Sequence, residues 1–493
     1  MTNRTTTKTK YSLPKAGLVI GDEKLTSASG GTFEHRFPGT GEIQAEVPVA
    51  GAPEVEAAVA AAKAAYPSWR GTSPATRRDL LFRLADLVEL NGEEFAWIGA
   101  REVGSPISGV RIIPGKFSAW TKYAAGWADK LEGRVVSSLQ DDTVFDYTIS
   151  EPYGVIGMIL TWNGPLMALA MKIGPALAAG NTVVIKPPEI SPFTAWRLMQ
   201  LVEEADFPPG VVNLVTGGAE AGEALIRHPD VQKIAFTGGV ATARSIATTI
   251  APLLKPAIWE LGGKSANLVF ADADMDVAVR HAARTPFFLA GQGCILPTRV
   301  LVEADIASEF VERVVAEIAS LKIGDPMDPA TELGPVASKQ AQVRLLDIIA
   351  AAKKRADGKL ALGGGKPASV HPEGYFVEPT VFTNVHPKSD LGQKECFGPV
   401  IAVMTFRDEE EAVAIANGTQ FGLGAYLHST NLSRTLRLSH RLNAGSIQVN
   451  GAPTARENAP FGGLGLSGFG REGGRDGMQE FVRIKNVAIA PVP

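Results

Sequence analysis

Three side chains in this sequence are suited to attack on a carbonyl group, and the first is a cysteine. Cys294 ends the segment FFLAGQGC and follows glycines that let a ligand or another backbone approach closely. A cysteine thiolate is a strong nucleophile, although a single cysteine is more often buried and unreactive. The role of Cys294 therefore depends on what folds beside it.

Glu260 and Asn163 could supply the other two groups that such an attack requires. Glu260 ends a predicted strand before a Gly-Gly turn. Partial burial there would raise the pKa of Glu260 toward that of a general base, although most such glutamates are simply solvated. Asn163 could donate its amide to a developing oxyanion, with capping of a helix at Pro165 as the alternative.

Two loops have the composition expected for binding a nucleotide. Lys186 and Glu189 follow a predicted strand, where they could hydrogen-bond a sugar. Gly238 and Gly239 open a predicted helix, and free backbone amides at a helix start favour a diphosphate. Each loop alone is weak support, because the GxGxxG dinucleotide pattern is absent.

The chain from Val155 onward predicts a scaffold for these residues. Short β-branched runs alternate with helical segments, which indicates a parallel sheet with helical crossovers. The predicted strands are Val155–Leu160, Thr182–Ile185, Val211–Val215, Lys233–Phe236 and Ala257–Leu261, with helices beginning near Pro165, Ser191, Ala219 and Val240. Because ligands bind outside the carboxyl ends of such strands, loops 161–165, 186–189 and 237–240 should share one rim.

Further elements are predicted on both sides of this sheet. Residues 54–66 and 76–103 have helical periodicity, and residues 134–150 read as an exposed hairpin or arm. A second α/β unit is predicted from a strand at 265–270, a helix from 274 to about 290, and strands at 300–302, 400–406 and 446–449. An apolar strand after Gln479 should pair with the arm or with another subunit.

Composition excludes several classes of protein. The 493 residues are 45% apolar and 20% charged, a globular profile, and the net charge of −4 gives no reason to expect nucleic acid binding. Lys172 and Pro175 interrupt the most apolar stretch, so no membrane-spanning segment is expected. Two cysteines and no secretory signal favour the cytoplasm, and the seven histidines form no apparent metal-ligand cluster.

The order and spacing of the motifs resemble the aldehyde dehydrogenase superfamily. The resemblance covers most of the chain through Trp162-Asn163-Gly164-Pro165, Lys186-Pro187-Pro188-Glu189, Phe236-Thr237-Gly238, Glu260-Leu261-Gly262-Gly263-Lys264-Ser265, Gly291-Gln292-Gly293-Cys294, Glu395-Cys396-Phe397-Gly398-Pro399 and Pro460-Phe461-Gly462-Gly463. It implies a Rossmann-like cofactor domain (11–127 and 151–261), an α/β catalytic domain (262–462) and a small β oligomerisation arm (128–150 and 475–493). A homodimer or homotetramer is implied.

The resemblance also implies catalytic roles. Cys294 would attack the aldehyde, while the Asn163 amide and the Cys294 N–H hold the oxyanion. Hydride transfer to nicotinamide would leave a thioester, and water activated by Glu260 would release the acid. Lys172 corresponds to a lysine often placed in the family's proton relay. The alternatives are an enzyme that passes the thioester to coenzyme A and a catalytically silent structural relative.

The same resemblance implies a cofactor site. Lys186 and Glu189 would bind the adenosine ribose, Trp162 and the Gly238-Gly239 turn would lie near the diphosphate, and Glu395 and Phe397 would position the nicotinamide ribose and ring. Glu189 favours NAD because a carboxylate repels a 2′-phosphate, while Lys186 and Arg244 leave NADP open.

The remaining residues of interest bear on the substrate. Departures from the family pattern at Gly164 and Gly239-Val240 indicate an unusual site shape. A hydrophobic or aromatic aldehyde is expected from the apolar residues Phe287, Phe288, Ile295, Leu296 and Phe461, although core packing is an equal alternative for each. Cys396 is interpreted as a packed residue of the cofactor pocket.

Overall fold

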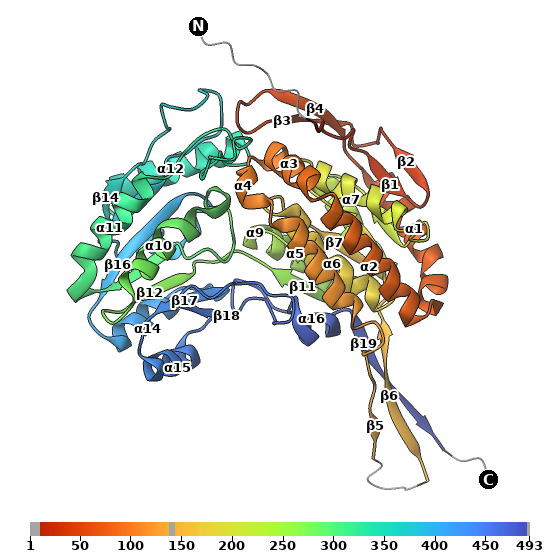
Figure 1. Ribbon diagram of the computed structural model, residues 1–493. Coiled ribbons are helices and arrows are strands. Elements are labelled where there is room, and N and C mark those ends of the chain that lie inside the picture. Colours follow the sequence, from red (N-terminus) through yellow and green to blue (C-terminus); the bar gives the residue numbers. More distant parts are fainter. Residues whose placement is uncertain (1–9, 138–142, 491–493) are drawn as a thin grey trace.

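The computed structural model describes residues 10–137 and 143–490, which form two α/β units and a projecting arm (Figure 1). Each unit is built on a seven-stranded sheet, and the arm is a three-stranded sheet. The mixed α/β fold predicted from the sequence is therefore confirmed. Within the described ranges, no helix is long and apolar enough to cross a membrane.

The first sheet has the strand order β11-β10-β7-β8-β9-β1-β2. Its five parallel strands are the predicted ones, namely β7 (Val155–Ile159), β8 (Thr182–Lys186), β9 (Val212–Leu214), β10 (Val231–Thr237) and β11 (Ala257–Glu260). In register, Ile159 lies opposite both Lys186 and Phe236, so the carboxyl ends of these strands are level. The last two strands of this order, β1 (Leu18–Ile20) and β2 (Glu23–Leu25), were not predicted, because three residues are too short to show a period.

Helices cover this sheet, and the segment 76–103 is helical as predicted, with one interruption. Residues 76–103 form two helices, α2 (Pro74–Leu90) and α3 (Gly92–Val103), because Asn91 leaves the helical conformation and its Nδ2 donates to the Leu87 carbonyl at 2.7 Å. Three predicted helix starts are confirmed and the fourth, near Ser191, falls at Phe193. The other helices are α1 (Ala52–Gly71), α4 (Ile107–Val110), α5 (Ile113–Ala125), α6 (Pro165–Ala178), α7 (Phe193–Glu204), α8 (Ala219–Arg227) and α9 (Val240–Ile250).

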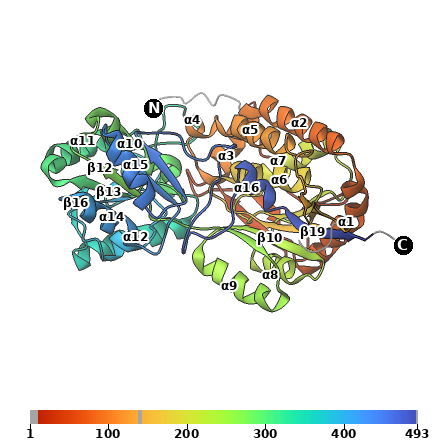
Figure 2. The ribbon, with the colours of Figure 1, turned by 90° about the horizontal axis from the view of Figure 1, so that it is seen from below.

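The second sheet has the order β14-β15-β16-β13-β12-β17-β18. Its strands are β12 (Ala266–Val269), β13 (Arg299–Glu303), β14 (Lys359–Leu362), β15 (Thr380–Thr383), β16 (Val400–Phe406), β17 (Gly424–His428) and β18 (Ser446–Val449), of which β14, β15 and β17 were not predicted. Its helices are α10 (Met275–Arg284), α11 (Ala307–Ala319), α12 (Lys339–Arg355), α13 (Asp390–Gln393), α14 (Glu409–Asn417) and α15 (Leu432–Arg441). Figure 2 shows this unit beside the first one.

The helix predicted from 274 to about 290 is also shorter than expected. The α-helix ends at Arg284 and a 3-10 segment follows over Thr285–Gly291. Leu289 and Ala290 have positive φ angles of 51° and 55°, which an α-helix of L-residues does not accommodate. This change of path turns the chain toward Cys294.

The arm combines two distant parts of the chain. β5 (Val135–Val136) and β19 (Val482–Ile489) flank β6 (Phe145–Pro152), and β19 pairs with β6 along its whole length. The apolar strand predicted after Gln479 therefore pairs with β6 of the arm in the same chain. The short helix α16 (Gly474–Gln479) precedes β19, while residues 138–142 and 491–493 of the predicted arm lie outside the described ranges.

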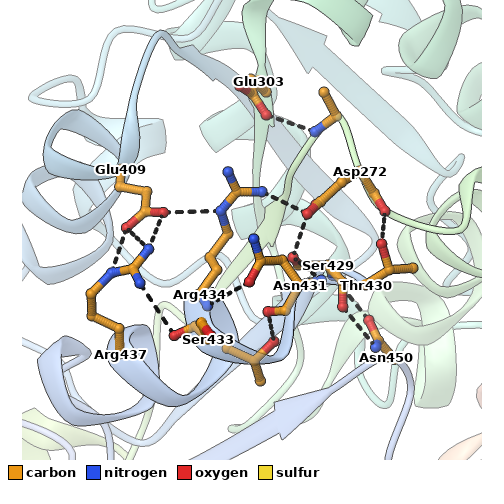
Figure 3. Close-up of polar contacts among 12 residues, drawn as sticks. Asp272, Glu303, Glu409, Ser429, Thr430, Asn431, Ser433, Arg434, Arg437 and Asn450 are labelled. Carbon is orange, nitrogen blue, oxygen red and sulfur yellow. Dashed lines mark hydrogen bonds and ion pairs between the residues drawn. The ribbon is translucent and has the colours of Figure 1, made fainter.

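An arginine-centred network fixes α15 to the end of β12 (Figure 3). The Arg434 guanidinium lies 2.8 Å from the Asp272 carboxylate and 3.0 Å from that of Glu409, and it stacks over Phe270 at 4.5 Å from the ring centroid. Arg437 binds the same Glu409 but is half exposed. Arg434 thus joins three segments, whereas Arg437 joins two neighbouring helices.

We expect Arg434→Met to lower the free energy of unfolding by about 1–3 kcal/mol, since it leaves Asp272 without its charged partner. The matched variant Arg437→Met should cost less than about 1 kcal/mol, as is usual for an exposed pair. Denaturant unfolding of both variants measures the difference. Equal losses would show that the network does not depend on Arg434.

Candidate active site

The carboxyl ends of β7, β8, β10 and β11 open onto one cavity of about 670 Å³. The loops after β7, β8 and β10 all contribute to its wall, so the shared rim predicted from the strand order is confirmed. Every predicted site residue except Lys172 lines this cavity, namely Trp162, Asn163, Lys186, Glu189, Gly238, Gly239, Glu260, Cys294, Glu395 and Phe397.

Cys294 reaches the cavity from a loop that packs directly on backbone. A Cβ added to Gly263 would lie 2.3 Å from the Cys294 carbonyl oxygen, so only glycine permits this approach. Burial raises the pKa of the half-buried Cys294 thiol to about 12, and the carboxylates of Glu260 and Glu395 add to the effect. The resting thiol is therefore protonated at neutral pH.

Asn163 is held by polar contacts on both ends of its amide. Its Nδ2 donates to the Gln292 carbonyl at 2.7 Å, and its Oδ1 accepts from the Thr161 hydroxyl at 2.9 Å. Gly164 caps α6 instead, so the helix-capping alternative for Asn163 is wrong. Because an amide nitrogen carries two hydrogens, one N–H remains for another acceptor.

Glu260 is a buried carboxylate whose two oxygens have no hydrogen-bond partner. Burial raises its pKa well above the usual value, and the nearby Glu472 raises it further, while Lys172 and Arg471 oppose the shift. A Cβ on Gly462 would lie 2.9 Å from Glu260 Oε1, so the glycine-rich C-terminal segment closes over this carboxylate. A carboxylate with a raised pKa is a better proton acceptor than an ordinary one.

Lys172 lies behind the cavity wall rather than in it. Its ammonium is fully buried, forms an ion pair with Glu472 and donates to the Thr237 hydroxyl at 2.7 Å. Glu472 was not singled out from the sequence, because a pairing across 300 residues leaves no local pattern. The acidic side chain within the glycine-rich segment 462–474 was the only available signal.

The nucleotide side of the cavity contains a lysine and a carboxylate. The Lys186 ammonium donates to the Gly217 carbonyl at 2.6 Å. Burial lowers the pKa of Lys186 to about 8, although the charge of Glu189 acts to raise it. A Cβ on Gly218 would lie 3.3 Å from the Glu189 carboxylate. The two side chains therefore lie at the predicted strand end, with Glu189 bordering the cavity.

The turn before α9 differs in one respect from the prediction. The N–H of Gly238 is not free, because it donates to the Glu260 carbonyl at 3.0 Å. Gly239 caps α9 and provides no side-chain hydrogen bond, so the first turn of the helix keeps amides that point out of it. An anion at this end would meet backbone amides of α9 rather than of Gly238.

The opposite wall combines a second carboxylate with two rings. Trp162 and Phe397 meet edge to face with centroids 5.5 Å apart. Glu395 accepts from the Gly263 N–H at 2.8 Å, and burial raises the pKa of Glu395 to about 7. Arg344, which was not predicted, also lines the cavity and donates to the Phe397 carbonyl at 3.4 Å.

These features fit a nicotinamide dinucleotide. The cavity offers a carboxylate for ribose hydroxyls at Glu189, uncapped amides for a diphosphate at α9, and ring walls at Trp162 and Phe397. Of the apolar residues predicted around the substrate, Phe287 packs in the core of the second unit, and neither it nor Phe288, Ile295, Leu296 or Phe461 lines the cavity. Cys396 is buried in the same core and borders a separate groove beside α12, so its assignment to the cofactor pocket is wrong.

Comparison with known proteins agrees with this geometry. The model of the aldehyde dehydrogenase family matches residues 25–487. An aldehyde dehydrogenase of Alternaria alternata is 38% identical, with 98% of each chain covered. PnpE of Pseudomonas sp. WBC-3, also solved with nicotinamide adenine dinucleotide, is 41% identical with a TM-score of 0.94, covering 97% of this chain and 98% of that one.

An NADP-dependent enzyme of E. coli is 32% identical with a TM-score of 0.93, covering 97% of this chain and 98% of that chain. The match thus extends to solved enzymes of both coenzyme types. The chain belongs to the aldehyde dehydrogenase family and is an NAD(P)-dependent oxidoreductase of aldehydes.

Proposed function

We propose that this enzyme oxidises hydrophobic or aromatic aldehydes to carboxylic acids through a covalent adduct on Cys294. The observation that supports the proposal is the single cavity lined by Cys294, Asn163 and Glu260 together with the nucleotide-side residues. No one of these side chains is decisive alone. The convergence of Cys294, Asn163 and Glu260 from three separate segments provides a nucleophile, an oxyanion donor and a base around one space.

In the first step the Cys294 thiol gives up its proton to water, and the thiolate sulfur bonds to the aldehyde carbon to form the thiohemiacetal anion. The negative charge that develops on oxygen is held by the free N–H of Asn163 and the backbone N–H of Cys294. The contacts of Asn163 to Gln292 and Thr161 fix the amide before substrate arrives. This preorganisation avoids a reorientation cost in the transition state.

Lys186, Glu189, Trp162, Glu395, Phe397 and the start of α9 at Gly239 would hold the dinucleotide. When bound, the nicotinamide supplies the acceptor for the hydride that leaves the substrate carbon. The acyl group then remains on Cys294 as a thioester. Glu189 favours NAD over NADP, because its carboxylate would repel a 2′-phosphate.

Glu260 takes a proton from a water molecule, and the oxygen of that water attacks the thioester carbon. The acid and the Cys294 thiol are then released. The unpaired oxygens and raised pKa of Glu260 suit it to this role. Lys172, bound to Glu472 and Thr237, opposes the rise in the pKa of Glu260 and so favours the ionised carboxylate that accepts the proton.

The apolar character of the substrate is inferred from the charges that are absent from the cavity. Among its described lining residues, Lys186 and Arg344 are the cationic side chains, and both are already bound to backbone carbonyls. Ile295 and Leu296 follow the nucleophile in the sequence, and Phe461 precedes Gly462, which lies against Glu260; all three are partly or fully buried, and none lines the cavity itself. A neutral, apolar aldehyde suits these surroundings best.

We also propose the domain roles given by the family resemblance, with the cofactor bound by 11–127 and 151–261, catalysis in 262–462, and an arm of 128–150 and 475–493. The arm would join subunits in a homodimer or homotetramer, since Val135, Phe145 and Ile484 are apolar and exposed on it. A cytoplasmic location is supported by the two free cysteines.

Glu260→Gln should slow deacylation at least tenfold while leaving acylation nearly intact, because glutamine cannot accept the proton. Stopped-flow NADH absorbance should then show a burst equal to the enzyme concentration, followed by a slow steady rate. An unchanged steady rate would exclude Glu260 as the base. Formation of acyl-CoA on adding coenzyme A to the wild type would favour the acyl-transferring alternative.

Alkylation of Cys294 in the cofactor-free enzyme should accelerate about tenfold per pH unit from pH 7 to 10, because a pKa near 12 keeps the thiolate scarce below it. Iodoacetamide labelling followed by peptide mass spectrometry measures this rate, with Cys294→Ser as the blank. A plateau with a midpoint below pH 8 would contradict the raised pKa of the thiol.

A steady-state screen of aliphatic, terpenoid, aromatic and carboxylated aldehydes with each coenzyme tests the substrate class. We expect the highest kcat/KM for apolar aldehydes and for NAD over NADP. Glu189→Gln should narrow the coenzyme preference, since it removes the repelling charge. Best turnover of small polar or carboxylated aldehydes would refute the proposed class.

A further inference from the structure

The segment that follows Cys294 is bound to a tyrosine from the second sheet. The hydroxyl of Tyr426, on β17, donates to the Ile295 carbonyl at 3.1 Å across 131 residues of sequence. Tyr426 is 2% exposed, so water does not compete for this hydrogen bond. The bond acts on the residue next to the nucleophile.

Two glycines bring backbone against the same segment. A Cβ on Gly263 would lie 2.3 Å from the Cys294 oxygen, and one on Gly424 would lie 2.6 Å from Ile295 Cγ1. These contacts limit how far the loop can move toward the sheet. These contacts are only repulsive at short range, however, so they do not hold the loop in place.

The tyrosine ring is itself held in place. It packs against the His281 ring with centroids 5.1 Å apart, and His281 is hydrogen-bonded to His428 at 3.2 Å. In the register of the sheet, Tyr426 lies between Asn267 on β12 and Gln448 on β18, both buried. Because its ring is fixed in this way, Tyr426 can restrain the Cys294 loop instead of moving with it.

We propose that Tyr426 is a positioning residue for the nucleophile, holding the Cys294 loop against the Gly263 and Gly424 backbones through the Ile295 carbonyl. The inference rests on the proposed role of Cys294 as nucleophile. Tyr426 touches neither substrate nor cofactor in this role. Its hydrogen bond determines how far the Cys294 sulfur extends into the cavity.

Tyr426→Phe removes the hydroxyl and keeps the ring that packs on His281. We expect the NADH burst to slow about fivefold to tenfold, the equivalent of one hydrogen bond lost from a loop that must be ordered for attack. The affinity for NAD should stay within about twofold, because the nucleotide-side residues are unchanged. Iodoacetamide should label Cys294 faster in the cofactor-free variant, because the loop no longer holds the sulfur in its half-buried place.

Three further variants complete the experiment. Tyr375→Phe alters another buried tyrosine and should leave the burst and the labelling rate unchanged. Gly424→Ala pushes on Ile295 from the sheet side and should slow the burst without removing any hydrogen bond. Cys294→Ala should abolish the burst. Melting temperatures of all four establish that each variant is folded.

The outcomes separate the two proposals. Tyr426→Phe with burst and labelling rates within twofold of the wild type overturns the positioning role, and so does a loss of stability alone. If Cys294→Ala still forms NADH, the proposed nucleophile is wrong, whatever Tyr426→Phe shows. Both proposals are supported if Cys294→Ala forms no NADH and Tyr426→Phe shows a slower NADH burst together with faster iodoacetamide labelling of Cys294.

Discussion

The active site depends on a turn that is too tight for side chains. β11 ends at Glu260 and β12 begins at Ala266, so the chain passes from one sheet to the other at this point. A Cβ on Gly262 would lie 2.1 Å from the Glu395 carboxylate, and one on Gly263 would lie 2.3 Å from the Cys294 carbonyl. The paired glycines therefore let the loops of Glu395 and Cys294 close directly beside Glu260.

The resulting site concentrates acidic groups in a buried place. Burial raises the pKa of Cys294, Glu260 and Glu395, and the carboxylates of Glu260 and Glu395 raise that of Cys294 further. The buried Lys172, paired with Glu472, partly offsets this for Glu260. The Cys294 thiol is therefore protonated at rest, and Glu260 binds a proton more readily than an ordinary carboxylate does.

Much of the site could be predicted because strand ends have a local signature. Lys186, Gly239 and Glu260 each follow an apolar run, and parallel strands bring their carboxyl ends together. Features made by distant contacts could not be predicted, such as the Lys172 pairing with Glu472 and the binding of Ile295 by Tyr426. The helix predicted up to about 290 ends at Arg284, two residues before Pro286, and the positive φ angles of Leu289 and Ala290 then redirect the chain.

The central claim is that the substrate becomes attached to one particular sulfur. The direct measurement is to mix enzyme, NAD and a benzaldehyde-class substrate, quench in acid within milliseconds, and map the acyl group by peptide mass spectrometry. We predict the acyl mass on the peptide that contains Cys294 and none on the peptide that contains Cys396. Acylation of Cys396, or turnover with no acylated cysteine at any time, would contradict the account.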